Sequence, residues 1–224
     1  MTRVVEVPRR RLPRWLSGFA ERHGEPAVTA TPDAVVLTGA DGVAATLKVP
    51  FPPLDVRAEA PYAGLLDHVA VDRRVGALLV RRGGYAAGVF VGERLVDSKV
   101  GSRHVQGRTK AGGWSQHRFA RRRDKQAREA FEAAADVAAR VLVPAAADLV
   151  TVVCGGDRRA VDAVLADSRM APLLPLAEHR LLAVPDPRQR ILAQLPERFL
   201  AVRVELADDD AEPPEPPVHH TGEE

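Results

Sequence analysis

The sequence predicts an α/β domain, built from a mixed β-sheet covered by helices, that follows a small N-terminal α+β domain. The fold class of the whole chain is then α+β. Short runs of apolar and β-branched residues are separated by Gly- and Pro-containing turns, which is typical of strands and hairpins. Later in the chain, strand-like runs alternate with helix-like runs, which favours a sheet with helices packed on it. The irregular stretch 50–61, PFPPLDVRAEAP, interrupts both patterns. We therefore expect domains at 1–68 and 69–206.

The first domain is expected to contain a strand, a helix and a hairpin. RVVEVP at 3–8 predicts a short strand. An amphipathic helix should follow, because apolar residues recur at i, i+3, i+4 and i+7, and Gly24 is a suitable end for it. Those apolar residues are Leu12, Trp15, Leu16 and Phe19. Three β-type runs come next, at 27–31, 34–39 and 43–49, and the Asp41-Gly42 pair indicates a hairpin between the last two.

The second domain begins with three predicted strands and continues with alternating helices and strands. The three strands are GALLV, YAAGVFVG and RLVDSKVG, within 76–101. A long helix should run from about Ser115 to Val143, because Pro144 would end it. The expected order beyond it is a buried strand at 148–156, a helix at 157–167, a strand at 179–184, a helix at 186–195 with Pro187 in its first turn, and a final strand at 198–206.

Composition excludes several classes of protein. The chain of 224 residues is 46% hydrophobic and 28% charged, as in a globular protein, and it lacks an apolar run of membrane-spanning length. The charged N-terminus is not followed by the apolar run of a secretory signal, so a cytoplasmic location is expected. The single cysteine, Cys154, excludes an internal disulfide and a cysteine-based zinc site, and the histidines lack metal-binding spacing. We expect neither a metal nor another cofactor.

Charge is distributed unevenly along the chain. The net charge is +2, yet residues 208–224 hold seven acids and no Lys or Arg, so residues 1–207 carry +9. This acidic, proline-rich tail, from 207 on, is expected to be disordered. Residues 99–128 contain ten Lys or Arg and a single acid, Asp124, which is a local footprint typical of polyanion binding. Arg outnumbers Lys 28 to 4, which also indicates a GC-rich genome, so part of the arginine content reflects codon bias.

The stretch 101–123, GSRHVQGRTKAGGWSQHRFARRR, combines four glycines, two glutamines and dense positive charge with no acid. Ser115 is a good N-cap, which places Gln116 in the first helical turn. Backbone N–H groups there lack intrahelical partners and can stabilise a phosphate or an oxyanion. The Gln116 side chain cannot act as a base, but it can orient water. Chemistry alone leaves a phosphate-binding loop as an equally good interpretation.

The helix that follows carries a basic surface in its first turns. Arg118, Arg122 and Lys125 form one stripe, with Arg121 and Arg128 beside it. An apolar face develops only further along, at Ala127, Phe131, Ala134, Ala138 and Val141. We therefore expect the first two turns to project from the domain, and we favour nucleic-acid contact over a merely solvated face. The expected RNA-binding residues are Arg103, Arg108, Lys110, Arg118, Arg121, Arg122, Arg123 and Lys125.

A second glycine-containing turn has a structural interpretation. Cys154-Gly155-Gly156-Asp157 lies between a predicted strand and a predicted helix, but its spacing differs from that of a dinucleotide-binding fingerprint. A nucleophilic Cys154 is not favoured, because no His or Asp can be placed beside it from the sequence.

The quoted stretch resembles the signature of the Vms-like release factors, in particular their actinobacterial branch, whose members are peptidyl-tRNA hydrolases. Wider relatives include the central domain of eukaryotic and archaeal class-one release factors, whose Gly-Gly-Gln loop enters the peptidyl-transferase centre. The resemblance covers residues 75–206 and implies a release-factor central-domain-like fold. It also implies that Gly112, Gly113 and Gln116 take the place of the release loop and its glutamine, and we add Ser115, the expected N-cap beside Gln116, to these expected catalytic residues. The chain departs from the pattern in having Trp114 and Ser115 between the glycines and the glutamine.

The resemblance implies a peptidyl-tRNA hydrolase that releases nascent peptide on stalled or split ribosomes during ribosome-associated quality control. Its partners would be the large ribosomal subunit and peptidyl-tRNA, with no role for DNA or a membrane. We expect no stop-codon-reading domain, so the protein should act without reading a codon. Two alternatives remain open at this point. One is an endonuclease that cuts the tRNA near its 3′ CCA end, and the other is a non-catalytic factor that binds the ribosome or tRNA.

Overall fold

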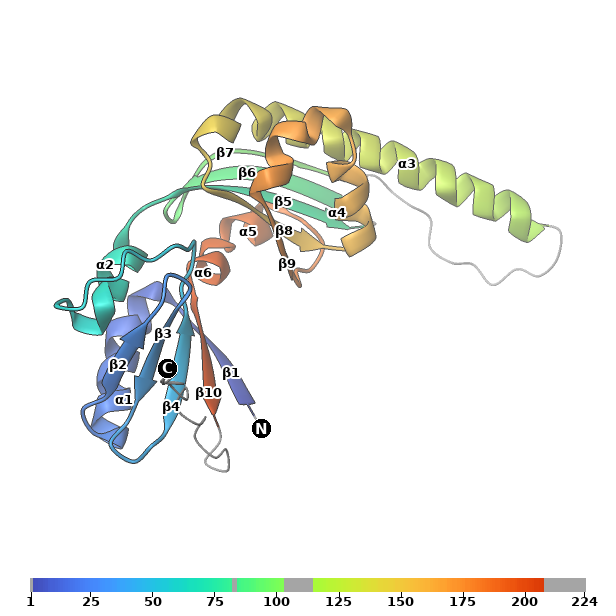
Figure 1. The fold of residues 1–224 in the computed structure, drawn as a ribbon. Coiled ribbons are helices and arrows are strands. Elements are labelled where there is room, and N and C mark those ends of the chain that lie inside the picture. Colours follow the sequence, from blue (N-terminus) through green and yellow to red (C-terminus); the bar gives the residue numbers. More distant parts are fainter. Residues whose placement is uncertain (1, 82–83, 103–114, 208–224) are drawn as a thin grey trace, which may run out of the picture. The chain divides into compact units, whose positions relative to one another are not determined.

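The computed structural model describes residues 2–81, 84–102 and 115–207, with the backbone alone described over 115–125. The chain forms two compact units, each with its own sheet (Figure 1). Unit 1 comprises the chain up to Leu66 together with the chain from Val202 on, and unit 2 comprises Asp67–Ala201. The predicted α/β class, with two sheets and covering helices, is confirmed.

Unit 1 contains a five-stranded antiparallel sheet in the order β1-β10-β4-β3-β2. The strands are β1 (Thr2–Val7), β2 (Ala27–Ala30), β3 (Ala34–Thr38), β4 (Ala44–Lys48) and β10 (Val202–Ala207). The predicted hairpin is β3–β4, and Gly42 in its turn has a φ of 86°. The sequence patterns of the first 50 residues therefore identified four of these five strands.

One amphipathic helix provides the apolar face that packs in unit 1. Helix α1 (Leu12–His23) follows a 3-10 turn at Arg9–Arg11 and ends at Gly24, whose φ of 77° favours glycine. Leu12, Leu16 and Phe19 of α1 are buried, as the apolar periodicity predicts. Buried valines and leucines of β3, β4 and β10 complete this core. A 3-10 turn at Pro61–Gly64 and helix α2 (Leu65–Ala70) then lead into unit 2.

Unit 2 contains a mixed five-stranded sheet in the order β7-β6-β5-β8-β9. The strands are β5 (Arg74–Arg81), β6 (Gly84–Val91), β7 (Arg94–Gly101), β8 (Thr151–Gly156) and β9 (Ala177–Leu182). The β5–β6 and β6–β7 pairs are antiparallel hairpins, whereas β5–β8 and β8–β9 are parallel. The long helix in the β7–β8 connection and the shorter one after β8 make these parallel pairings possible.

Helices cover both faces of the second sheet (Figure 1). Helices α3 (Ser115–Val141) and α4 (Arg158–Leu165) pack over one face, where Leu78, Val89 and Cys154 lie in the main apolar cluster. The opposite face meets α5 (Gln189–Ala193) and α6 (Pro196–Phe199), where the Phe90 and Phe199 ring centroids are 5.3 Å apart. Two 3-10 segments, at Val143–Asp148 and Ser168–Leu176, connect these elements.

Two details of the C-terminal third differ from the sequence prediction. The helix expected over 186–195 is shorter, because the backbone of Arg188, the residue just before α5, is extended, which leaves Pro187 before the helix. The strand expected over 198–206 begins later, since α6 occupies its first residues. That strand, β10, also lies between β1 and β4 rather than in the second domain to which the sequence boundaries assigned it. Its alternating valines, Val202 and Val204, fit any antiparallel sheet with one buried face.

Candidate functional site

The connection between β7 and α3 is held firmly at its strand end. Gly101, the last residue of β7, lies opposite Tyr85 in the β6–β7 register. A Cβ atom at Gly101 would overlap the Tyr85 ring, so this ring covers the main chain where the strand ends. Gly84 is similarly enclosed, because a Cβ there would lie 3.2 Å from the Pro187 carbonyl oxygen and 3.3 Å from that of Gly101. The loop therefore starts from a closely packed edge of the sheet.

The loop ends at the N-terminus of α3, which begins at Ser115. Gln116 is the second residue of this helix and so lies in its first turn. The N–H groups of a first helical turn have no intrahelical acceptors, and the helix dipole makes this end electropositive. The first turn contains no acidic residue that would neutralise it. The backbone geometry is therefore suited to a negatively charged or polarised oxygen.

The C-terminal part of α3 is anchored in the core. Ala130, Ala134, Ala135, Ala138 and Val141 are buried in unit 2. Figure 1 shows that α3 continues past the sheet toward its N-terminus. Arg128, three turns into the helix, is exposed. The apolar pattern that the sequence shows in the later part of this helix thus corresponds to residues that are buried in the core.

Arg169 fixes the anchored part of α3 to the segment after α4. Its Nη1 donates to Asp136 Oδ1 of α3 at 2.7 Å, while its Nη2 and Nε donate to the two Asp167 carboxylate oxygens at 2.7 and 2.9 Å. These hydrogen bonds lower the pKa of Asp167 to about 2 and raise that of Arg169. Sequence reasoning missed this network, because three separated charged residues form no periodic signal. A bidentate arginine clamp is the strong form of such a contact.

The structure brings some of the predicted site residues together on one helix and leaves others undescribed. Those in α3 are Ser115, Gln116, Arg118, Arg121, Arg122, Arg123 and Lys125. The remaining predicted residues, Gly112, Gly113, Arg103, Arg108 and Lys110, lie outside the described residues. Within α3, Arg118, Arg122 and Lys125 follow the helical spacing i, i+4, i+7, so their positions fall on one side of the helix.

Comparison with known proteins identifies the family. The family model described as Actinobacteria/chloroflexi VLRF1 release factor matches residues 73–205. The chain belongs to this release-factor family. The match extends from β5 into β10, so it includes the loop, the basic start of α3 and all strands of the second sheet. The family resemblance noted in the sequence is thereby confirmed.

Among solved structures, this chain is similar to an archaeal translation termination factor, aRF1, with 16% identity and a TM-score of 0.38. That similarity covers 89% of this chain and 66% of the archaeal one. A second structure, of an archaeal protein, has 16% identity and a TM-score of 0.34, covering 85% of this chain and 62% of the other. The chain thus spans just under two thirds of the length of these solved structures. No match is found among curated proteins.

The second glycine turn of this release factor has a packing role. A Cβ atom at Gly155 would lie 2.8 Å from Leu79 Cδ2, and one at Gly156 would overlap the Val80 carbonyl oxygen. Asp157 caps α4 by accepting from the Arg159 N–H at 3.1 Å, as predicted. The Cys154 thiol is buried, and burial raises its pKa to about 12, so it is protonated and shielded at neutral pH. This turn therefore serves structure rather than nucleophilic chemistry.

Unit 2 also has a small hollow on the helical side of its sheet. A hollow of about 290 Å³ lies between α3 and α4, lined by Arg128, Phe131, Glu132, Ala135, Ala163, Ala166 and Asp167. This volume is at the lower limit for a small-molecule site. Among the described residues, no group of three His, Cys, Asp or Glu side chains could hold a metal ion. Nor does any helix in the described ranges have the length and apolarity needed to cross a membrane.

Proposed function

We propose that this release factor is a peptidyl-tRNA hydrolase that frees nascent peptides on stalled or split ribosomes in ribosome-associated quality control. One observation carries the proposal: Gln116, which follows the Gly112-Gly113 pair, lies in the first turn of a long helix with a basic start, in a chain of a release-factor family. Release of a peptide from tRNA is the hydrolysis of an ester, and a positioned water with oxyanion stabilisation is sufficient to accelerate such a reaction.

In the proposed mechanism, the loop brings the start of α3 to the ester bond between peptide and tRNA. Gly112 and Gly113 allow close approach of the backbone, because they lack side chains. Gln116 accepts and donates hydrogen bonds that orient the attacking water. Backbone N–H groups in the first turn of α3, which have no intrahelical acceptors, stabilise the oxyanion as it forms. The 2′-hydroxyl of the terminal tRNA nucleotide assists proton transfer to the leaving oxygen, so no cofactor is required.

The basic residues would position the protein on RNA. Arg and Lys side chains bind phosphates, and the affinity they provide does not depend on base sequence. We assign this role to Arg103, Arg108 and Lys110 of the loop and to Arg118, Arg121, Arg122, Arg123 and Lys125 of α3. Their targets would be phosphates of the large-subunit RNA and of the tRNA acceptor end. Such binding suits a protein that acts on stranded peptidyl-tRNA without reading a codon.

The fate of the tRNA tests this proposal directly. Purified protein would be mixed with large subunits that carry a stalled peptidyl-tRNA, and the released tRNA would be examined at its 3′ end. We expect full-length tRNA with an intact CCA end that can be aminoacylated again, because the ester bond alone is broken. A tRNA shortened at its 3′ end would contradict hydrolysis and indicate an endonuclease. Binding without any release of peptide would indicate a non-catalytic factor.

A further inference from the structure

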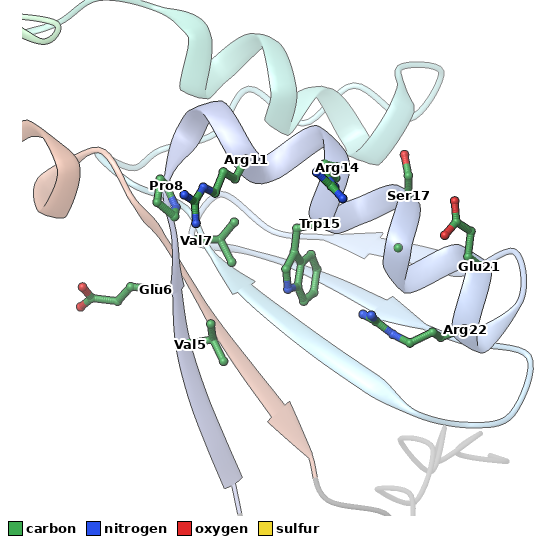
Figure 2. A pocket seen from close by; sticks show the side chains of 11 residues that line it. Val5, Glu6, Val7, Pro8, Arg11, Arg14, Trp15, Ser17, Glu21 and Arg22 are labelled. Atoms are coloured by element: carbon green, nitrogen blue, oxygen red, sulfur yellow. The ribbon is translucent and has the colours of Figure 1, made fainter.

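Unit 1 contains a groove of about 800 Å³ between β1 and α1, and all residues that line it belong to this unit. It is lined by Val5, Glu6, Val7, Pro8, Arg11, Arg14, Trp15, Ser17, Gly18, Glu21 and Arg22. Figure 2 shows β1 on one side of this space, α1 on the other, and the Trp15 ring pointing from the helix toward the strand. β1 is the outer strand of its sheet, so the groove is bounded by the edge of that sheet.

Trp15 forms a fixed aromatic platform in the groove. Its ring stacks on that of the buried Phe19, with centroids 5.7 Å apart and planes at 24°. Phe19 in turn contacts His23, at a centroid distance of 4.7 Å. Gly18 leaves the helix surface bare, since its nearest neighbour there would be Arg22 Nη1, 3.8 Å from a Cβ atom. A flat apolar group can stack on a tryptophan ring that is partly exposed and held in one orientation by its neighbours.

Positive charge surrounds this platform. Arg11, Arg14 and Arg22 are exposed, and their guanidinium groups form no hydrogen bond or ion pair with the residues that the structure describes. Figure 2 shows the Arg22 side chain extending along the helix toward Trp15. Two acids also line the groove, but in the same view Glu6 points away from α1 and Glu21 projects from the other side of the helix. The groove thus combines an indole ring with three available guanidinium groups.

We propose that this groove binds the acidic, proline-rich segment 208–224 of the same chain. That segment contains Glu-Pro-Pro-Glu-Pro-Pro at 212–217 and has seven acids with no Lys or Arg. Proline rings pack well on aromatic side chains in grooves, and they lose little conformational freedom on binding. Glutamate and aspartate carboxylates form charge-assisted hydrogen bonds with arginine. Each chemical feature of the segment therefore has a counterpart in the groove.

The connectivity allows the segment to reach the groove within one molecule. β10 ends at Ala207, which pairs with Thr2 at the start of β1. The six residues of β1 extend about 20 Å, whereas residues 208–224 can span about 50 Å when extended. Attachment to the same chain through a short linking segment provides an effective concentration on the order of millimolar. Even a weak contact between proline, carboxylate and groove would therefore be substantially occupied.

A spin label on the segment tests the proposal in the full chain. Thr221→Cys would introduce an accessible thiol for a nitroxide, while the buried Cys154 thiol would stay unmodified. The indole N–H signal of Trp15 would be followed in a nitrogen-15 NMR spectrum, with Trp114→Phe used to assign the second indole. We expect the label to weaken the Trp15 signal severalfold relative to the reduced, diamagnetic sample.

Matched variants separate docking from mere proximity of a tethered segment. Arg11→Glu, Arg14→Glu and Arg22→Glu combined should restore the Trp15 signal, because they reverse the groove charge. Replacing Pro213, Pro214, Pro216 and Pro217 with Ser should also restore it, because the charge of the segment is kept but its rings are lost. Arg140→Glu, Arg159→Glu and Arg190→Glu, three exposed positions in unit 2, make the same change in net charge and should leave the weakening intact.

Three results would overturn the proposal. The first is equal weakening of the Trp15 signal in the parent and in either the groove or the proline variant. The second is weakening confined to α3, which would mean that the acidic segment binds the basic helix instead. The third is weakening that appears only between a spin-labelled molecule and a separate nitrogen-15-labelled one, which would mean that the segment docks on a second copy.

Discussion

At the scale of single residues, substitution of Gln116 distinguishes an effect on catalysis from an effect on binding. If it orients the attacking water, Gln116→Ala should slow peptide release by about a hundredfold or more, as loss of one transition-state hydrogen bond does. Affinity for the stalled complex should scarcely change, because a neutral amide contributes little to phosphate binding. Single-turnover release from pre-bound complexes measures the chemical step alone.

Two further variants make the Gln116 experiment specific. Gln116→Glu should also fail, because a carboxylate loses the N–H donors and introduces negative charge among RNA phosphates. Gln106→Ala is the matched control in the same stretch, and we expect a milder effect because Gln106 precedes the glycine pair. Full activity of Gln116→Ala would refute the catalytic assignment.

Asp167 gives a prediction for acid stability. Hydrogen bonds from Arg169 lower its pKa in the folded state from near 3.8 to about 2. A carboxyl group with a lowered folded pKa stabilises the fold above its unfolded pKa, and this contribution is lost as the pH falls from about 4 to 2. Asp167→Asn should therefore weaken the pH dependence of the unfolding free energy in this window. The effect should be small because the pair is solvent-exposed.

Urea unfolding at a series of pH values between about 5 and 2 would measure this dependence. Asp148→Asn is a suitable control, because the Asp148 carboxylate is exposed and makes no hydrogen bond or ion pair with the described residues. An Asp167→Asn variant with the same pH slope as the parent would contradict the assignment.

At the scale of elements, the start of α3 should determine binding to RNA. Arg121→Glu, Arg122→Glu and Arg123→Glu combined should abolish binding to ribosomes or tRNA while leaving the circular dichroism spectrum unchanged. Binding by the parent should weaken steeply as salt rises, because each neutralised phosphate releases counterions. Sedimentation with large subunits over a range of salt concentrations measures both effects.

The triple variant already used as a charge control for the groove also serves as the control for the basic start of α3. Arg140→Glu, Arg159→Glu and Arg190→Glu alter net charge equally but lie outside the basic start of the helix, so binding should be retained. If the α3 triple variant bound as well as the parent, its arginines would form only a solvated face.

Elements with a regular pattern could be predicted from the sequence. Helix α1, the β3–β4 hairpin and the Asp157 cap of α4 were recognised because each has a local signal: apolar spacing, a turn pair or a capping side chain. The 3-10 segment at Ser168–Leu176 was missed, because Pro172 and Pro175 break any helical period. The Arg169 clamp was missed because it depends on which elements meet in space.

The candidate site, like the fold, could be predicted only where it has a local sequence signal. The position of Gln116 in a first helical turn followed from Ser115 as a start signal and from the long periodic pattern beyond it. The proposed role of Gln116 requires that the loop reach the ester bond of peptidyl-tRNA, and local sequence patterns do not determine whether it does. The enclosure of Gly101 by Tyr85 also could not be predicted, since it requires the register of β6 on β7.

At the scale of the whole molecule, the position of β10 changes what constitutes the N-terminal domain. The sequence placed this domain at 1–68, yet its sheet has β10 between β1 and β4. A fragment of residues 1–68 should therefore remain unfolded, because β1 would have no neighbour. Residues 1–66 joined to 202–207 through a flexible linker should fold. Dispersion of amide signals in NMR spectra would distinguish the two, and a folded 1–68 fragment would show that β10 is dispensable.

The insertion of β10 beside the first strand also sets an order of events during synthesis. Domains generally form in the order in which they leave the ribosome, starting from the N-terminus. Here the strand that joins β1 to β4 is made after the whole of Asp67–Ala201. The sheet of unit 1 therefore cannot be completed, and β1 stays unpaired, until nearly all the chain has been translated. We propose that this protein rescues interrupted translation. If its own translation were interrupted, the domain that is made first would remain incomplete.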